Sequence, residues 1–218
     1  MKTVVITGVS RGMGKATAEK FLSEGWYVFG TSTRGETAIV HENFEVYAVN
    51  MFDSQTISNF AKAVGKSGRK IDVLHNNAGT SLQDDHGAIN VEVLRKTLEV
   101  NLIGLIDLTE RLLPNIKDCG HIINMVSAGA SLVEFSGSYV PCYQISKVGV
   151  NMYTRELATR LQERGIIVSS FDPGWVRTDM GGKDAPRDPK DVAEEIYKLA
   201  ITQVESGFFW HEGKKRSW

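Results

Sequence analysis

Short runs of β-branched and aromatic residues alternate with longer helical segments along the whole sequence. The runs predict strands at Thr3–Thr7, Tyr27–Thr31, Glu45–Val49, Val73–Asn76, His121–Ser127, Ile166–Phe171 and Gly207–Trp210. Helices are predicted at Gly14–Ser23, Ser54–Lys66, Glu92–Leu113, Tyr143–Glu163 and Pro189–Val204. Apolar strands that alternate with helices are typical of a parallel sheet with both faces covered. We therefore expect an α/β fold, a doubly wound parallel sheet of about seven strands, with residues 1–218 forming one domain.

Charge, hydropathy and cysteine content exclude several classes of protein. With 25 Lys and Arg residues against 26 Asp and Glu residues, the net charge of −1 disfavours a nucleic-acid partner, and Lys214–Arg216 is interpreted as a solvated tail. The chain contains no apolar run of about 18 residues and no signal peptide, so we expect a cytoplasmic protein without a membrane partner. Cys119 and Cys142 are predicted to be free thiols, and the histidine spacing predicts no metal site.

A glycine-rich turn follows the first predicted strand, with the sequence TGVSRGMG at Thr7–Gly14. Gly8 permits a tight turn, Gly12 allows the backbone to approach a pyrophosphate, and Gly14 allows the helix to pack closely against the strand. The helix that follows presents free N–H groups and the positive end of its dipole to the phosphate. The turn therefore predicts a nucleotide-binding site, although its spacing differs from the G-x-G-x-x-G fingerprint.

The end of the second predicted strand indicates which dinucleotide binds. In NAD-binding folds, an acidic residue about 20 positions past the turn accepts hydrogen bonds from the ribose hydroxyls. Here the residue 20 positions after Gly14 is Arg34, and the strand end Gly30–Arg34 contains no Asp or Glu. Together, Arg34 and Arg11 are suited to bind a 2′-phosphate by charge-assisted hydrogen bonds. NADP(H) is therefore the expected cofactor, with NAD(H) as the alternative.

Tyr143 and Lys147 are four residues apart at the start of a predicted helix, so both lie on one face of it. A phenol with a pKa of about 10 is a poor acid–base group at neutral pH, but a nearby ammonium stabilises the phenolate and lowers this pKa. The pair is therefore a candidate proton donor for a carbonyl oxygen. Because Tyr and Lys at this spacing are also common for structural reasons, the pair gains meaning only from the other motifs.

Six motifs occur in a fixed order between residues 7 and 178. They are the turn at Thr7–Gly14, Asn76-Asn77-Ala78-Gly79, Asn101, Ser127, Tyr143-x-x-x-Lys147 and Pro173-Gly174-x-Val176-x-Thr178. With these motifs the chain resembles the short-chain dehydrogenases/reductases. The segments Pro173–Gly182 and Gly207–Lys214 resemble the small carbonyl-reductase-like branch, which includes C-factor-like and sniffer-like proteins. The resemblance implies a Rossmann fold and a reaction in which the cofactor brings the hydride and the protein brings a proton.

The resemblance also implies a role for each motif. Tyr143 would protonate the carbonyl oxygen, and Ser127 would form a hydrogen bond with that oxygen. Lys147 would bind the nicotinamide ribose and lower the pKa of Tyr143, and Asn101 would position a water that relays protons through Lys147. Homodimers or homotetramers, formed through the helices Glu92–Leu113 and Tyr143–Glu163, are also implied. The expected cofactor-binding residues are Gly8, Ser10, Arg11, Gly12, Met13, Gly14, Thr33, Arg34, Asn50, Met51, Asn77, Ala78, Gly79, Tyr143, Lys147, Pro173, Gly174, Val176 and Thr178.

Three positions depart from the family pattern. The 16 positions from Ser127 to Tyr143 exceed the spacing that is commonest in the family, so Ser131 is a second candidate for the serine role. Asn50 stands where the family usually has an Asp that contacts adenine, and its amide oxygen can still accept a hydrogen bond. His75 stands in a strand position that is usually aliphatic, and we interpret it as a core histidine with satisfied hydrogen bonds.

The segment between Thr178 and the last predicted helix is short, which predicts an open substrate pocket. Its expected walls are Val133, Phe135, Tyr139, Trp175 and Met180. Such walls favour a small apolar or aromatic ketone, aldehyde or quinone, which the enzyme would reduce to the alcohol. The alternatives are a dehydrogenase of secondary alcohols with NAD(P)+ and a dinucleotide-binding regulatory protein with little turnover. A sugar-nucleotide epimerase would need a larger C-terminal domain than the 40 residues after Thr178.

Overall fold

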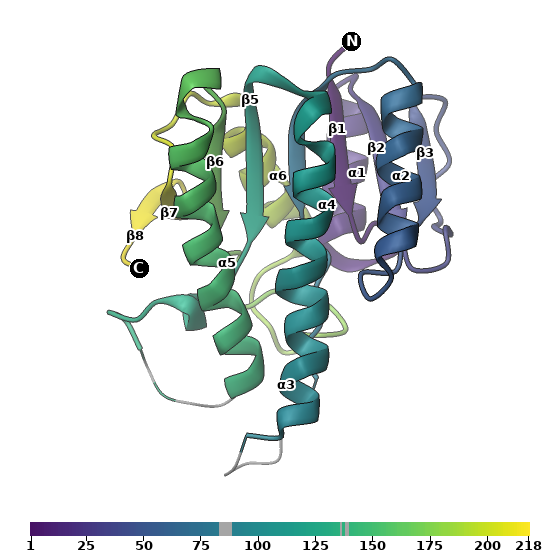
Figure 1. Cartoon of the computed structure of the whole chain (residues 1–218). Coiled ribbons are helices and arrows are strands. Elements are labelled where there is room, and N and C mark those ends of the chain that lie inside the picture. The colour runs from purple at the N-terminus through teal and green to yellow at the C-terminus, as the bar shows by residue number, and fades with distance from the viewer. Residues whose placement is uncertain (83–88, 136, 138–139) are drawn as a thin grey trace.

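The computed structural model describes residues 1–82, 89–135, 137 and 140–218, and one eight-stranded sheet runs through its centre (Figure 1). Neighbouring strands are parallel except for the last pair, and the spatial order is β3-β2-β1-β4-β5-β6-β7-β8. This is the doubly wound arrangement that the sequence predicted, with one additional strand. The strands are β1 (Thr3–Thr7), β2 (Tyr27–Ser32), β3 (Phe44–Ala48), β4 (Ile71–Asn76), β5 (Ile116–Met125), β6 (Ile167–Phe171), β7 (Phe208–His211) and β8 (Lys214–Arg216).

Helices cover both faces of the sheet, and each face has its own apolar core. Helices α2, α4 and α5 lie in front of the sheet in Figure 1, whereas α1 and α6 lie behind it. Because successive strand residues point to opposite faces, Val5 packs in the front core, whereas Val4 and Ile6 pack in the rear core. The α-helices of the described residues are α1 (Gly12–Ser23), α2 (Ser54–Lys66), α3 (Val91–Leu98), α4 (Gly104–Leu112), α5 (Pro141–Arg160) and α6 (Pro189–Ile201).

The predicted helix Glu92–Leu113 changes its helix type along its length. A π-helical turn at Glu99–Ile103 separates α3 from α4, and α3 extends below the sheet in Figure 1. The segment is helical from Val91 to Leu112, so the prediction of a helix is confirmed, and the π turn is the feature that the sequence did not predict.

The interpretation of Lys214–Arg216 as a solvated tail is wrong. These residues form β8, which pairs antiparallel with β7 through Phe209 with Arg216 and Trp210 with Lys215. The Arg216 side chain is also held by two carboxylates from distant parts of the chain, which a count of local charges does not reveal.

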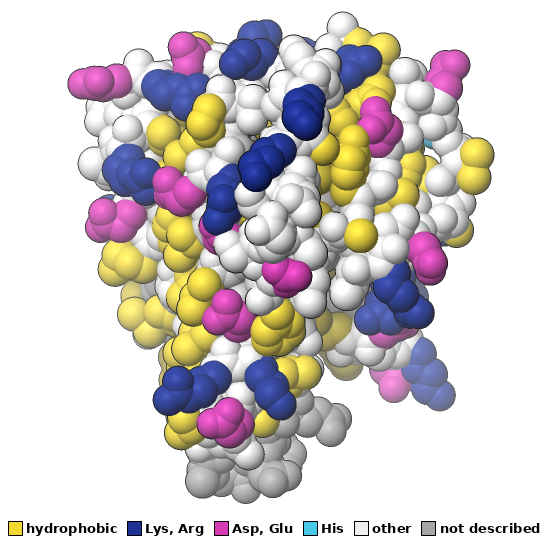
Figure 2. Space-filling model, turned by 45° about the vertical axis from the view of Figure 1, so that its right-hand side comes forward, with side chains coloured by type: hydrophobic (Ala, Val, Ile, Leu, Met, Phe, Trp, Pro, Cys, Tyr) yellow, Lys and Arg dark blue, Asp and Glu magenta, His cyan; other side chains and the backbone are white. Residues whose placement is uncertain are grey.

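On the face in Figure 2, Lys and Arg side chains are interspersed with Asp and Glu. Among the described residues, no helix combines the length and the apolar composition that crossing a bilayer requires.

His75 lies on β4 in the middle of the sheet, where it is fully buried. It is a core residue, as predicted, but its ring nitrogens form no hydrogen bond of ordinary geometry with a described side chain, and the backbone of Ile123 is the polar group beside it. Burial lowers the pKa of His75 from 6.5 to about 4, with the Ile123 backbone opposing the shift. The imidazole is therefore neutral in the folded protein at neutral pH.

The buried His75 is expected to make the protein less stable in acid. The unfolded chain binds a proton at this residue below pH 6.5, whereas the folded protein resists protonation until about pH 4. His75 therefore does not reduce the free energy of unfolding well above pH 6.5. Below that pH it reduces this free energy progressively, by about 2 kcal/mol at pH 5. In urea unfolding at pH 8 and pH 5, His75→Leu should reduce the difference between the two pH values by about that amount. The exposed His41→Leu is the control, and an unchanged difference in His75→Leu would contradict the prediction.

Candidate active site

The carboxyl ends of the parallel strands meet at the lower edge of the sheet in Figure 1, where ligands bind in open α/β folds. A cavity of about 420 Å³ opens there between the glycine-rich turn, the ends of β2 and β4, and the segment after Thr178. Many residues expected to bind the cofactor line this cavity. They are Gly8, Ser10, Arg11, Gly12, Met13, Thr33, Asn50, Met51, Asn77, Ala78, Gly79 and Thr178.

The glycine-rich turn has the backbone conformation that its glycines allow. Gly8 and Gly12 have φ values of +77° and +56°, in the region that favours glycine. A Cβ atom on Gly14 would lie 2.2 Å from the carbonyl oxygen of Gly8, so only a glycine allows α1 to pack against the turn. The backbone at Gly8 and Gly12 therefore faces the cavity without side chains, at the start of α1, and this fits the phosphates of a dinucleotide.

Asn77 joins the end of β4 to the end of β1 beside this turn. Its Nδ2 donates a hydrogen bond to the carbonyl oxygen of Thr7 at 2.8 Å. The Thr7 hydroxyl oxygen accepts hydrogen bonds from the backbone N–H groups of Asn77 at 3.0 Å and Ala78 at 2.8 Å. These bonds fix the turn relative to β4. The Asn77 side chain therefore holds the turn in place and also lines the cavity.

The structure brings Lys147, Asn101, Gly79 and Tyr143 together. The Nζ atom of Lys147 lies 5.6 Å from the centre of the Tyr143 ring, and a Cβ atom on Gly79 would lie 3.5 Å from Nζ and 3.3 Å from Oδ1 of Asn101. Lys147 is 2% exposed and donates a hydrogen bond to the carbonyl oxygen of Met125 at 2.8 Å. Burial lowers the pKa of Lys147 from 10.5 to about 8, so the ammonium still predominates at pH 7.

Asn101 lies in the π turn between α3 and α4 and is fully buried. Its Oδ1 accepts a hydrogen bond from the Thr80 N–H, and its Nδ2 donates to the Thr80 carbonyl oxygen, both at 2.8 Å. Nδ2 also donates to Oγ of Ser146 at 3.0 Å. Asn101 thus connects the segment after β4 with α5, at a helix irregularity of the kind often found at functional sites.

The two candidate serines have different surroundings. Ser127 follows β5, is half-buried, and its Oγ accepts a hydrogen bond from the Gly129 N–H at 3.2 Å. The Ser131 side chain is buried, donates to the carbonyl oxygen of Trp218 at 3.2 Å and accepts from the Glu134 N–H at 2.9 Å. The Ser131 hydroxyl is therefore committed to the loop and to the end of the chain.

The Pro173–Gly174 turn follows β6 and is held by residues that the sequence analysis did not single out. Gly174 has a φ of +69°, and its N–H donates to Oδ1 of the buried Asp172 at 3.0 Å. Nη1 of Arg187 donates to the carbonyl oxygen of Pro173 at 2.7 Å. Asp172 stands directly before the Pro-Gly pair, so the sequence contained a signal for its hydrogen bond with Gly174. The hydrogen bond from Arg187 to Pro173 depends on the fold. Val176 is buried beyond this turn.

The two arginines expected to bind a 2′-phosphate are both exposed. Arg11 lines the cavity and forms an ion pair with Asp179 at 3.0 Å. Arg34 follows Thr33, which lines the cavity, but Arg34 itself does not belong to the lining. Arg11 is thus already oriented across the mouth of the cavity toward the segment after Thr178.

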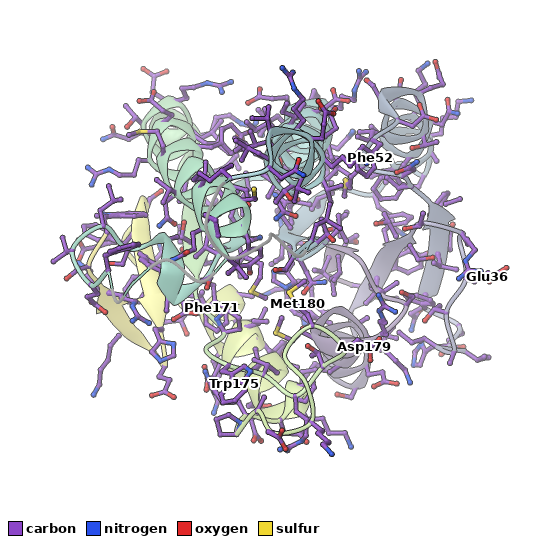
Figure 3. All side chains as sticks on the ribbon, turned by 90° about the horizontal axis from the view of Figure 1, so that it is seen from below. Glu36, Phe52, Phe171, Trp175, Asp179 and Met180 are labelled. Carbon is purple, nitrogen blue, oxygen red and sulfur yellow. The ribbon has the colours of Figure 1, made fainter. Side chains whose placement is uncertain are left out.

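The predicted substrate walls are only partly assembled. Met180 lines the cavity, and in Figure 3, viewed onto this end of the sheet, it lies toward the centre while Trp175 lies farther out. The Nε1 of Trp175 donates to the carbonyl oxygen of Gly181 at 2.7 Å, which keeps the indole on this loop. Val133 and Phe135 are exposed and do not line the cavity. The remaining predicted wall, Tyr139, lies outside the described residues.

Comparisons with known proteins identify the family of the chain. The model of the short chain dehydrogenase family matches residues 2–188, and the chain belongs to this family. Serine 3-dehydrogenase of Agrobacterium fabrum is 29% identical to it over 95% of this chain and 86% of that protein. An NADPH-dependent 3-dehydrocapnine reductase of Ornithobacterium rhinotracheale is 33% identical over 94% of this chain and 78% of that protein.

Solved structures show the same architecture. The NADPH-bound carbonyl reductase from chicken fatty liver has a TM-score of 0.92 and 26% identity, over 100% of this chain and 99% of that one. The fold of carbonyl reductase Sniffer of D. melanogaster is also similar, with a TM-score of 0.91 and 24% identity over 100% of both chains. The protein is therefore an NAD(P)-dependent oxidoreductase of the carbonyl-reductase-like branch of this family.

Proposed function

We propose that the protein reduces a small apolar or aromatic ketone, aldehyde or quinone to the alcohol, with NADPH as the reductant. The observation that carries the proposal is the burial of Lys147 next to Asn101 and Tyr143, at the end of the sheet where the dinucleotide cavity opens. Burying a lysine so deeply is costly, and strongly perturbed groups of this kind cluster at functional sites. This supports an enzyme over a regulatory protein that only binds a dinucleotide.

In the proposed reaction, Tyr143 is the proton donor to the carbonyl oxygen. The Lys147 ammonium stabilises the Tyr143 phenolate that the proton transfer leaves behind. Lys147 uses one of its three N–H donors for Met125, so two remain for the ribose hydroxyls of the cofactor. NADPH, when bound, supplies the hydride. Asn101, whose side chain is hydrogen-bonded to the backbone of Thr80, positions the water that relays protons through Lys147.

Ser127 is the better candidate for the second hydrogen bond to the carbonyl oxygen. Its hydroxyl accepts from the Gly129 N–H, and this leaves the hydroxyl hydrogen available to donate to a substrate. Ser131 donates its hydroxyl hydrogen to Trp218 instead. We therefore assign the serine role to Ser127.

Two apolar side chains of the segment after β6 support this substrate class. Met180 lines the cavity, and Trp175, five positions earlier in the sequence, is 58% exposed. Exposed apolar residues of this size favour a substrate whose body is apolar or aromatic. The oxidation of a secondary alcohol by the same residues is the reverse of the proposed reaction.

Loss of NADPH absorbance with a panel of quinones, aromatic aldehydes and ketones tests the proposed function. We expect turnover with at least one aromatic carbonyl compound, and faster turnover with NADPH than with NADH. Tight binding of NADPH without turnover across the panel would contradict the proposal and favour the regulatory protein.

The preference for NADPH is expected to depend on Arg11 and Arg34. Each hydrogen bond to a charged partner contributes about 1.5–3 kcal/mol, reduced at exposed positions, so Arg11→Ala/Arg34→Ala should lower kcat/KM for NADPH about 10- to 100-fold. The kcat/KM for NADH should change less than about 3-fold, because NADH lacks the 2′-phosphate. Initial rates with both cofactors measure the effect, and Lys62→Ala/Lys66→Ala, at two exposed lysines of α2, controls for the loss of two positive charges. Equal losses with both cofactors would contradict the assignment.

A further inference from the structure

Three segments that are far apart in the sequence meet at Arg216 on β8. Nε and Nη2 of Arg216 donate hydrogen bonds to one oxygen of Glu134, at 3.0 and 2.8 Å. Its Nη1 donates to Oδ2 of Asp172. The Asp172 side chain is 2% exposed, whereas that of Glu134 is 41% exposed. One guanidinium therefore joins a buried carboxylate to a carboxylate on a surface loop.

The Asp172 contact reaches the Pro173–Gly174 turn. Oδ2 of Asp172 binds Arg216, and its Oδ1 accepts the Gly174 N–H at 3.0 Å. The backbone N–H of Asp172 donates to the carbonyl oxygen of Trp210 on β7 at 2.9 Å, so the base of the turn is fixed in the sheet. Through the Asp172 carboxylate, the guanidinium is connected to the turn expected to hold the nicotinamide.

The Glu134 contact reaches the loop that follows Ser127. The Glu134 N–H donates to Oγ of Ser131, and the Val133 N–H donates to the carbonyl oxygen of Trp218 at 3.0 Å. Ser131 follows the short turn Ala128–Ala130 that Ser127 caps. Trp218 and Arg216, which both belong to the C-terminal segment, thus hold this loop in place.

We infer that Arg216 is a positioning residue, which sets the place of the Ser127 loop relative to the Pro173–Gly174 turn. The inference rests on the proposed function, because these segments carry the groups proposed to contact the carbonyl oxygen and the nicotinamide. A single exposed ion pair would contribute little. Here a planar guanidinium with a rigid donor geometry bridges two carboxylates, one of them buried, so a shift of either loop breaks a charged hydrogen bond.

Glu134→Ala is the first variant, because it removes the surface contact and leaves Arg216 paired with Asp172. A displacement of a reacting group by about 1 Å can lower the rate about 100-fold, and loosening of one loop should lower kcat about 10-fold. NADPH binding and the thermal unfolding midpoint should stay close to those of the wild type, since Glu134 is 41% exposed. Glu205→Ala is the matched control: it also removes a glutamate paired with β8, at 2.6 Å from Lys215, and should keep the wild-type kcat.

A double-mutant cycle separates positioning from a general effect on stability. Arg216→Lys keeps a positive charge beside Asp172 but removes the planar group of donors that spans both carboxylates. Arg216→Lys should therefore lower kcat as Glu134→Ala does, and adding Glu134→Ala to Arg216→Lys should lower it no further. Multiplicative effects, or a kcat of Glu134→Ala within about 2-fold of the wild type, would overturn the inference.

Hydrogen exchange of backbone amides gives a measurement that does not depend on turnover. Glu134→Ala should speed exchange across the loop 127–135, and Arg216→Lys should speed it there and at Gly174, while Glu205→Ala should change neither. Unchanged exchange in both variants would overturn the inference. A wild-type protein that reduces no carbonyl compound but shows this exchange pattern would overturn the proposed function and leave the connection between the two loops established.

Discussion

Tyr143→Phe is expected to lower the turnover of a carbonyl substrate about 1000-fold, with little effect on NADPH affinity. The substitution removes one hydroxyl group and keeps the aromatic ring, whose centre lies 5.6 Å from Nζ of Lys147. The hydrogen bond of Lys147 to Met125 does not involve this hydroxyl. The variant should therefore keep the cavity and lose the proton donor.

Two measurements distinguish this outcome from a folding defect. The rate of NADPH consumption reports the chemistry, and the fluorescence of bound NADPH reports the cavity. Tyr153→Phe is a matched control on the same helix, because it removes a hydroxyl that donates to Glu110 at 2.9 Å, away from the cavity. It should cost about 1 kcal/mol of stability and keep the turnover. If Tyr143→Phe kept more than a tenth of the wild-type rate, another group would have to be the proton donor.

Gly14→Ala is expected to have the largest effect on the glycine-rich turn. The added Cβ would lie 2.2 Å from the carbonyl oxygen of Gly8 and 2.5 Å from Nδ2 of Asn77, and the first of these is backbone that cannot rotate away. Overpacking in a rigid site costs about 1–3 kcal/mol, and here it also displaces the start of α1 from β1. We expect a loss of stability of about 3 kcal/mol and at least a 100-fold weaker binding of NADPH.

Gly65→Ala makes the same chemical change as Gly14→Ala but is expected to have the opposite effect on stability. Gly65 lies in α2 on the exposed side, and the nearest atoms to an added Cβ are those of the Asn115 side chain, at 3.6 Å. Because alanine favours the helix, this variant should be more stable by about 0.5–1 kcal/mol and bind NADPH as the wild type does. Urea unfolding and NADPH titration of both variants test the pair. A Gly14→Ala variant that binds NADPH normally would contradict the assigned packing role.

Much of this fold was predictable because its signals are local. The buried strands read as apolar runs, and the start and end of α2, Ser54–Lys66, were predicted to the residue, since Asp53 caps the helix and Ser67 and Gly68 follow it. The glycine-rich turn was likewise recognisable, because its conformation depends on the absence of side chains. The placement of Tyr143 beside Lys147 followed from the helix period alone.

The features that the sequence did not predict depend on contacts between distant residues. Arg216 and Glu134 are 82 positions apart, and only the fold brings β8 beside the loop after Ser127. The hydrogen bond from Ser131 to Trp218 spans 87 positions, so the sequence did not show that the Ser131 hydroxyl has this partner. The π turn at Asn101 has no local composition that distinguishes it from a regular helix. Long-range partners, rather than propensities, decided each of these cases.

Strand β8 also forms one outer edge of the sheet. The outer edge of a sheet exposes N–H and C=O groups that invite pairing with a strand of another chain. Here that edge is three residues long and consists of Lys214, Lys215 and Arg216. A strand this short offers few hydrogen bonds to an incoming partner, and pairing along it would bring another chain against two exposed lysines. The short, lysine-bearing strand thus disfavours edge-to-edge pairing at this side of the sheet, while its last arginine contacts the segments that form the site.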